Sequence, residues 1–169
     1  MKNIKILSLF SGIGAPEKAI SNIGVKYDLV GFSEIDPNAI KAYCLIHNID
    51  EKLNLGDISK IDINSISEFD LLLAGFPCTD ISHNGKQKGF TDTTTSSGLV
   101  NYAINIISLK KPKVILFENV KNLISKKFKE DFNFMVSNIE RLGYKCHYKL
   151  LNTKDFGLLE LLATKVARF

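Results

Sequence analysis

The sequence has few cysteines and no long apolar run, and both absences limit what the protein can be. Its 169 residues contain three widely spaced cysteines, Cys44, Cys78 and Cys146. An odd number does not form a disulfide framework, and without a C-x-x-C pair we expect no metal site. No stretch reaches the roughly 18 consecutive apolar residues of a membrane span. Residues 1–6 lead straight into a strand-like pattern without the features of a signal peptide, so we expect a cytoplasmic protein.

Arginine is scarce as well, because Arg141 and Arg168 are the only arginines among 22 basic residues. Arginine is the preferred side chain for bidentate reading of guanine, so we expect little readout of a base sequence here. The net charge of +4 is too small to imply a nucleic-acid partner by itself. A hydrophobic fraction of 45% and a charged fraction of 24% are typical of a globular protein, and the length suits one domain.

Strand-like and helical patterns alternate along the chain. Apolar runs predict strands at residues 4–10, 27–33, 70–74, 113–117 and 144–151, with a further short one at 53–55. Helical spacing predicts helices at residues 17–23, after Pro37, and at 99–109 and 130–142. The alternation predicts parallel β-α-β units, and therefore an α/β fold with a Rossmann-like, mostly parallel sheet and helices on both faces.

Chemically distinctive residues follow four of the predicted strands. These residues are F-S-G-I-G at 10–14, E-I-D at 34–36, F-P-C at 76–78 and E-N-V at 118–120. Open α/β sheets bind ligands at the carboxyl ends of their strands. The coincidence of four such segments therefore predicts one binding site along that edge.

The first two segments indicate a nucleoside site. Gly12 and Gly14 would let a ligand approach the backbone at a helix N-terminus, although Glu17 replaces the third glycine of a dinucleotide motif. Glu34 could accept hydrogen bonds from both ribose hydroxyls, or it could be a solvated carboxylate at a strand end. Asp57 could accept a hydrogen bond from an adenine amino group, or it could bond to its own turn.

The other two segments carry reactive groups. Cys78 follows a proline at a strand end, a placement that suits a nucleophile as well as a structural thiol. Glu118 ends an apolar strand, where partial burial would raise its pKa and favour proton donation; the alternative is a salt bridge to a nearby lysine. The neighbouring lysines are either a solvated face or contacts to a phosphate backbone, and they are Lys110, Lys111, Lys113, Lys121, Lys126, Lys127 and Lys129.

Taken in order, these motifs resemble those of the S-adenosylmethionine (SAM)-dependent DNA cytosine-C5 methyltransferases. The resemblance covers roughly residues 4–157. It rests on L-F-S-G-I-G at 9–14, P-C at 77–78 with Ser82 four residues after the cysteine, and E-N-V-K-N at 118–122. Residues 85–90 resemble the mobile active-site loop of the family, and residues 152–157 the lead-in to its Q-x-R-x-R motif. The fold implied is the SAM-dependent methyltransferase fold.

The resemblance also implies a role for each residue. Cys78 would add to C6 of a cytosine flipped out of double-stranded DNA, and Glu118 would hold or protonate N3 of that base. Phe10 and Ile35 would sandwich the adenine. Ser82, Lys86 and Lys88 would belong to the active-site loop or contact the DNA. The residues expected to hold SAM are Phe10, Gly12, Gly14, Glu34, Ile35, Asp57, Ile58, Pro77 and Leu99.

The sequence departs from the family pattern in three places. Ser8 and Thr79 stand where many members have an acid and a glutamine. After Gly157 the proline, glutamine and arginines of the family give way to L-L-E-L-L-A, with apolar residues at helical spacing. We therefore expect a partial catalytic domain at 1–157 and a divergent tail at 158–169. We also expect the last sheet strand to be missing, so that 144–151 is poorly paired and has an unsatisfied backbone edge, and the target-recognition domain to be absent.

These departures leave more than one interpretation of the function. The chain could be the truncated catalytic part of a bacterial or phage-encoded restriction-modification enzyme that needs a second polypeptide for target recognition. It could instead be a non-catalytic SAM-binding remnant of such an enzyme. In either case we expect no sequence-specific methylation of DNA by these residues alone. A nicotinamide-dependent oxidoreductase is disfavoured by Glu17 and by the P-C and E-N pairs.

Overall fold

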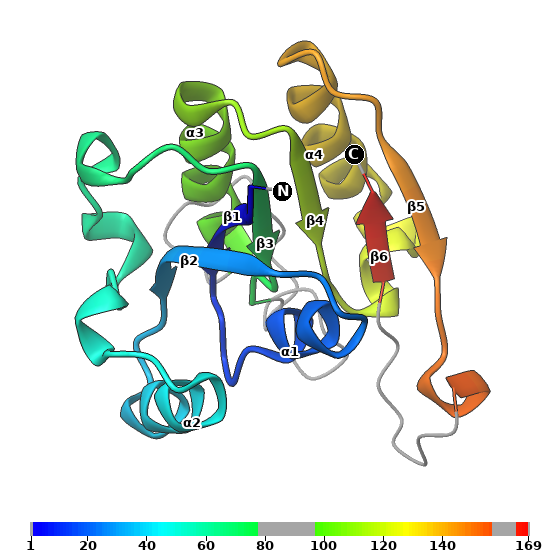
Figure 1. Ribbon diagram of the computed structural model, residues 1–169. Coiled ribbons are helices and arrows are strands. Elements are labelled where there is room, and N and C mark those ends of the chain that lie inside the picture. Colours follow the sequence, from blue (N-terminus) through cyan, green and yellow to red (C-terminus); the bar gives the residue numbers. More distant parts are fainter. Residues whose placement is uncertain (1, 78–96, 157–164, 169) are drawn as a thin grey trace.

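A six-stranded sheet forms the centre of the computed structural model, which describes residues 2–77, 97–156 and 165–168 (Figure 1). The strand order is β2-β1-β3-β4-β6-β5. β1 to β4 are mutually parallel, and β6 is antiparallel to both β4 and β5. The strands are β1 (Ile4–Leu9), β2 (Tyr27–Ser33), β3 (Leu71–Ala74), β4 (Val114–Phe117), β5 (His147–Leu150) and β6 (Lys165–Arg168). The predicted mostly parallel α/β sheet is confirmed.

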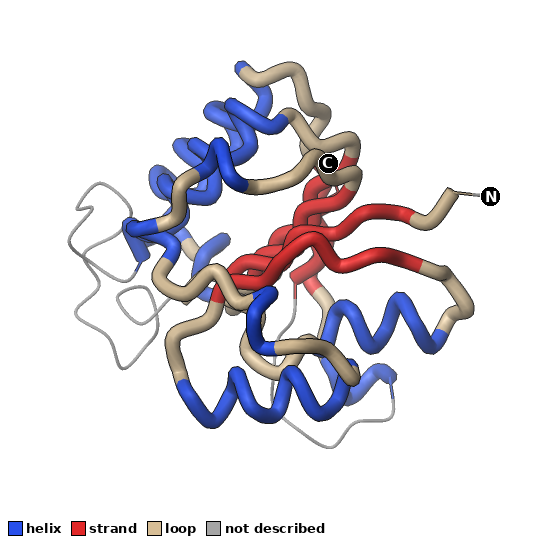
Figure 2. Tube along the Cα trace, turned by 60° about the vertical axis from the view of Figure 1, so that its left-hand side comes forward, coloured by secondary structure: helices blue, strands red, loops and turns tan. Residues whose placement is uncertain are grey.

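Helices lie on both sides of this sheet, as predicted (Figure 2). They are α1 (Ala15–Asn22), α2 (Pro37–His47), α3 (Val100–Lys110) and α4 (Lys129–Arg141). α2 begins where Asp36 accepts hydrogen bonds from the backbone N–H groups of Asn38 and Ala39, with Pro37 at its first position. In the described ranges no helix is long and apolar enough to cross a membrane.

Side chains alternate between the two faces of β1 and so bury both faces of the sheet. Leu7 and Leu9 belong to the main core cluster, which includes Ile107 of α3 and Ile139 of α4. On the other face, the ring of Phe32 stacks on Tyr43 of α2 with centroids 4.3 Å apart. A strand buried on both faces needs the nearly continuous apolar sequence that predicted it.

The register of the parallel strands brings their carboxyl ends into one row. Leu9 pairs with Ser33 of β2 and with Ala74 of β3, and Ala74 pairs with Phe117 of β4. The residues that follow these four positions therefore meet at one edge of the sheet. This arrangement assembles the candidate site.

Two expectations from the sequence are wrong. Residues 53–55 do not form a full strand: Glu51–Leu53 is a 3-10 helix, and Asn54 makes one isolated parallel bridge to Phe32. β5 is not left unpaired, because all four of its residues pair with β6. β6 lies between β4 and β5, where it satisfies backbone groups that would otherwise be exposed at a sheet edge. The helical spacing of apolar residues in the tail did not indicate that Lys165–Arg168 forms a strand.

Candidate functional site

The side chain of Glu34 is the centre of the polar network at the end of β2. Its Oε2 accepts a hydrogen bond from the backbone N–H of Gly12 at 2.8 Å. Its Oε1 accepts from the N–H groups of Ile35 at 2.8 Å and Asp36 at 3.0 Å. A carboxylate has roughly four acceptor positions, so about one is left for a ligand. Binding both ribose hydroxyls would therefore require a backbone N–H to move or to share an oxygen.

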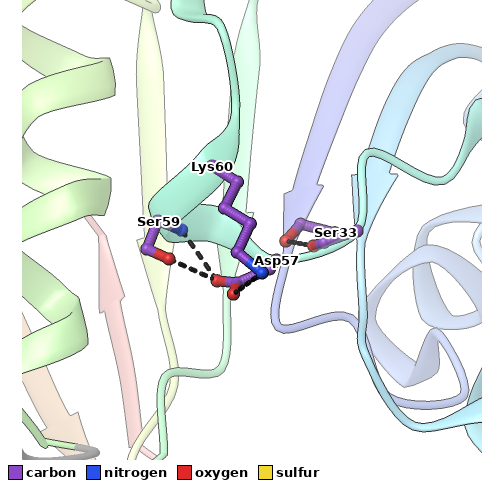
Figure 3. Close-up of polar contacts among 5 residues, drawn as sticks. Ser33, Asp57, Ser59 and Lys60 are labelled. Atoms are coloured by element: carbon purple, nitrogen blue, oxygen red, sulfur yellow. Dashed lines mark hydrogen bonds and ion pairs between the residues drawn. The ribbon is translucent and has the colours of Figure 1, made fainter.

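The side chain of Asn54 holds the backbone of Glu34 in place. Its Oδ1 accepts from the N–H groups of Glu34 and Gly56, at 3.2 and 3.1 Å, and its Nδ2 donates to the Glu34 carbonyl at 3.1 Å. Figure 3 shows that Ser33 reaches the same segment, because its hydroxyl donates to the Gly56 carbonyl at 2.6 Å. The segment that leads to Asp57 is thus tied to the end of β2.

Asp57 makes the turn interaction that was the alternative to a ligand contact. Its Oδ1 accepts from the backbone N–H and the hydroxyl of Ser59, at 2.9 and 2.8 Å (Figure 3). Its Oδ2 lies 3.6 Å from Nζ of Lys60. The bonds from Ser59, followed by Lys60, hold the pKa of the Asp57 carboxyl below its usual value. Asp57 therefore remains an ionised acceptor, and its predicted contact with adenine stays a prediction.

Gly12 and Gly14 have different surroundings in the turn after β1. Both have positive φ values, 53° and 77°, which favour glycine. A Cβ on Gly12 would meet no heavy atom within 4 Å, so a ligand could approach the backbone there. A Cβ on Gly14 would lie 2.2 Å from Nε2 of His47 and 2.6 Å from Cε2 of Tyr43. The space at Gly14 thus serves packing against α2, whereas the space at Gly12 is open.

The predicted apolar contacts to the cofactor differ in exposure. The side chain of Ile35 is 72% exposed, and Phe10 is half-buried with an unusual φ of 53°. Ile58 is buried in the core, so its side chain is not open to a ligand. Leu99, at the N-cap of α3, and Pro77, at the last described position after β3, are both partly buried.

Glu118 lies directly after β4 and is partly buried. Its backbone N–H donates to the Ala74 carbonyl at 3.0 Å, which extends the β3–β4 pairing by one residue. Burial raises the pKa of the Glu118 carboxyl above its usual value. Within residues 2–77, 97–156 and 165–168 it forms no ion pair, so the salt bridge proposed as its alternative is not present there. A carboxyl with a raised pKa suits proton donation.

Gly75 lies between Glu118 and the glycine turn. A Cβ on Gly75 would be 3.6 Å from Oε2 of Glu118 and 3.8 Å from the carbonyl oxygen of Phe10. The group predicted to act on a base and the turn predicted to hold the cofactor are therefore neighbours across one glycine. This spacing suits a reaction between two ligands bound side by side.

Asn119 joins the ends of β3 and β4. It is buried, its Nδ2 donates to the Phe76 carbonyl at 3.0 Å, and its Oδ1 accepts from the N–H of Val120 at 2.9 Å. The bond to Phe76 holds the backbone that leads into Pro77.

The remaining residues of the predicted catalytic and DNA-binding sets lie outside the described residues. These are Cys78, Ser82, Lys86 and Lys88. Thr79, which departs from the family pattern, also lies outside them.

The lysines near Glu118 divide into two groups. Lys110, Lys111 and Lys113 precede β4, at the opposite edge of the sheet, where Lys113 pairs with Asp70 at 2.6 Å. The other four follow β4, on the edge that holds Glu118, and are Lys121, Lys126, Lys127 and Lys129. The second group alone is placed to act together with the candidate site.

Sequence reasoning missed two contributors to the site, Asn54 and His47, and gave Asn119 of the E-N-V segment no role of its own. Asn54 and Asn119 act through side-chain bonds to backbone groups distant in the sequence, which no local pattern indicates. His47 was taken as an ordinary helix residue, yet its Nε2 lies 3.1 Å from the carbonyl oxygen of Ile13 in the glycine turn. The one signal in the sequence was Glu17, which stands where a dinucleotide motif has its third glycine and so indicates that this turn is not held as in that motif.

The parallel sheet with one antiparallel strand, and the polar groups at its carboxyl edge, define an α/β domain of the methyltransferase type. The crystal structure of the Dnmt2 methyltransferase of S. pombe has the same fold, with a TM-score of 0.72 and 22% sequence identity over 98% of this chain and 48% of that chain. Residues 4–159 match the C-5 cytosine-specific DNA methylase family, and the chain belongs to this family.

Curated relatives come from phages and bacteria. The orphan methyltransferase M.Rho11sI of Bacillus phage rho11s is 49% identical over 158 residues, which are 94% of this chain and 31% of the relative. The type II methyltransferase M.Bsp6I of Bacillus sp. (strain RFL6) is 38% identical over 154 residues, which are 91% of this chain and 48% of the relative. The chain thus spans less than half the length of either relative.

Proposed function

We propose that this chain binds SAM and carries the groups that transfer a methyl group to C5 of a cytosine flipped out of double-stranded DNA. One observation carries the proposal: Gly12, Glu34 and Glu118 lie on a single edge of the sheet, at strand ends that the register places side by side. The residues proposed to bind the nucleoside and the carboxyl proposed to donate a proton are thereby neighbours.

The residues at the ends of β1 and β2 fit SAM. Glu34 offers an oriented carboxylate for a ribose hydroxyl, and Gly12 leaves open space beside it. Ile35 presents an exposed apolar side chain next to that carboxylate, as an adenine ring would require. Asp57 remains an ionised acceptor for an amino group, and Pro77, Leu99 and the backbone at Ile58 would complete the site. When bound, SAM supplies an electrophilic methyl group.

Cys78 and Glu118 would activate the base. The thiolate of Cys78 forms a bond to C6 of the cytosine, and the electron pair displaced from the C5–C6 double bond makes C5 nucleophilic. Glu118 donates a proton or a strong hydrogen bond to N3, which prevents negative charge from building up on the ring. After C5 is methylated, a base removes its proton. The C5–C6 double bond then re-forms, and the sulfur leaves as thiolate.

Contacts to DNA would have to offset the cost of flipping a base, about a few kcal/mol. Lys121, Lys126, Lys127 and Lys129 could neutralise phosphates on the same edge, but such contacts do not distinguish sequences. We propose that target recognition needs a segment other than residues 1–169, and that these residues alone do not methylate a specific site.

Cofactor binding is tested by calorimetry with SAM and with NAD. Losing a charge-assisted hydrogen bond costs roughly 1.5–3 kcal/mol, so Glu34→Ala should weaken SAM binding at least about tenfold. Glu51→Ala, which removes an exposed glutamate of the nearby 3-10 helix, is the matched control and should bind as the wild type does. Preferential binding of NAD would contradict the proposal.

Catalysis is tested by transfer of labelled methyl from SAM to duplex DNA. The 169-residue polypeptide is assayed alone and mixed with any polypeptide encoded beside it. Site-specific 5-methylcytosine made by the 169 residues alone would show that no second polypeptide is needed. SAM binding without transfer in either assay would instead support a non-catalytic SAM-binding protein.

A further inference from the structure

Side chains of α2 contact the glycine turn at Ile13 and Gly14 and hold it in place. The carbonyl of Ile13 lies 3.1 Å from Nε2 of His47, and the N–H of Gly14 donates to the Ser11 carbonyl at 2.9 Å. Both ends of the Ile13–Gly14 peptide are therefore bonded. The preceding turn amide, the N–H of Gly12, is held from the other side by Glu34. These contacts leave the turn little freedom to change its orientation.

Tyr43 fills the remaining space under Gly14 and is itself fixed on three sides. Its ring stacks on Phe32 and packs against the ring of His47, with centroids 4.3 and 4.6 Å apart. Its hydroxyl donates to Oε1 of Glu17 at 2.7 Å. Because Tyr43 and His47 lie one helical turn apart on α2, the position of Tyr43 also sets the position of the imidazole.

Glu17 is a buried carboxylate with an incomplete set of partners. Its exposed fraction is 0%, and in the described part of the chain its Oε2 has no hydrogen-bond partner. Burying a carboxylate without hydrogen bonds costs free energy. Among the described residues, the hydrogen bond from Tyr43 is the one side-chain contact that offsets this cost for Glu17. Glu17 lies in the first turn of α1, where the positive end of the helix dipole also favours it.

The chemistry of Tyr43 keeps this contact in place. Burial, followed by the charge of Glu17 and the hydrogen bond to it, raises the pKa of the Tyr43 hydroxyl far above its usual value. The hydroxyl therefore stays protonated and continues to donate to Glu17.

We propose that Glu17, Tyr43 and His47 are positioning residues for the cofactor. This three-residue group, the brace, transmits the placement of α2 to the peptide between Ile13 and Gly14. It thereby keeps the backbone beside Gly12 in the conformation that receives the ligand. The inference rests on the proposed binding of SAM at this turn and extends it to residues that would not touch the ligand.

The brace is tested with His47→Leu, which removes the donor, and His47→Gln, whose amide nitrogen can replace Nε2. Tyr43→Phe removes only the hydroxyl. Leu45→Ala, at an exposed position of α2, is the matched control. The readouts are the dissociation constant for SAM, amide hydrogen exchange at Gly12 and Gly14 without ligand, and thermal unfolding.

We expect His47→Leu and Tyr43→Phe each to weaken SAM binding roughly three- to tenfold, the change that corresponds to one hydrogen bond. They should also speed exchange at Gly12 and Gly14 while the protein stays folded. His47→Gln should recover most of the affinity. A purely structural role would lower the unfolding temperature without changing the affinity of the folded protein, and that result would overturn the inference.

The exchange measurement separates this inference from the proposed function. If the wild type binds no SAM, the proposed function fails, but faster exchange in the variants would still support the brace. If the wild type binds SAM and the variants match it in both affinity and exchange, the brace alone is wrong. Tyr43→Phe decides the matter if His47→Leu does not fold.

Discussion

The side-chain nitrogen of Asn119 donates a hydrogen bond to the carbonyl oxygen of Phe76 over 3.0 Å, which ties the end of β4 to the end of β3. Glu118 immediately precedes Asn119 in the sequence, and Pro77 and Cys78 immediately follow Phe76. A single amide thus links the backbones that carry the two groups proposed to act on the cytosine.

Asn119→Ala should destabilise the protein by about 1–3 kcal/mol, because it removes the buried hydrogen bond to the Phe76 carbonyl and the bond from the N–H of Val120. Urea unfolding measures the change. Asn138→Ala is the control, since the bond of Asn138 to the Phe134 carbonyl is exposed on α4. Equal effects of the two substitutions would show that the hydrogen bonds of Asn119 add nothing beyond an ordinary surface contact.

Alanine at Gly14 should cost far more stability than alanine at Gly12. Both positions have positive φ, which costs a residue with a side chain roughly 1–2 kcal/mol. Gly14→Ala adds a clash with His47 and Tyr43, whereas Gly12→Ala meets open space. The two variants are compared by chemical unfolding. His47→Ala combined with Gly14→Ala should recover part of the loss, and strictly additive effects would contradict the packing explanation.

Alkylation should label Cys78 before the other two cysteines. Burial raises the pKa of the Cys146 thiol to about 11, and burial with nearby acidic residues raises that of Cys44. Both thiols are therefore poor nucleophiles near neutral pH. Peptide mapping after brief treatment with iodoacetamide gives the order of labelling. Faster labelling of Cys44 than of Cys78 would count against Cys78 as the nucleophile.

Glu118→Gln should stabilise the protein at neutral pH and lose that advantage in acid. Burial raises the pKa of Glu118 above its usual 4.5 in the folded state, so folding favours the protonated form. Below 4.5 both states are protonated and no penalty exists. As the pH rises through the folded pKa, the unfolded state ionises more readily and the wild type loses stability.

The prediction for Glu118 is checked by urea unfolding of both proteins near pH 4 and near pH 8. Glu68→Gln, at an exposed position, is the control. A wild type as stable as Glu118→Gln near pH 8 would show that Glu118 carries no burial penalty. In an assay where an added polypeptide supports methyl transfer, transfer should fall in the same variant, which would separate the contribution of the carboxyl to catalysis from its cost in stability.

The sequence predicted those parts of the fold that depend on patterns within single segments. The apolar runs that became β1 to β4 and the spacing of α1 to α4 are periodic within single segments. Glu34 and Glu118 were found because both follow such a run. The site edge followed from the general rule for parallel sheets, which the pairing of Leu9 with Ser33 and Ala74 satisfies.

What the sequence did not predict depends on contacts between distant segments. His47 meets Gly14 because α2 folds back under the turn. Lys165–Arg168 becomes a strand because β4 and β5 leave a gap of one strand between them, although the neighbouring apolar residues have helical spacing. Asp57 had two interpretations in the sequence, and its hydrogen bonds to Ser59 became known only from the structure.

The three N–H groups that hold the carboxylate of Glu34 have a consequence for the thermodynamics of binding. A free glutamate side chain loses roughly 1.5–2 kcal/mol of rotamer entropy when it is immobilised. Here that loss occurs when the chain folds, so the acceptor is preorganised and a nucleoside need not order it. The order parameters of the Glu34 side chain should therefore be the same with and without SAM. The carboxylate proposed to bind the ribose is therefore oriented when the chain folds, before any ligand arrives.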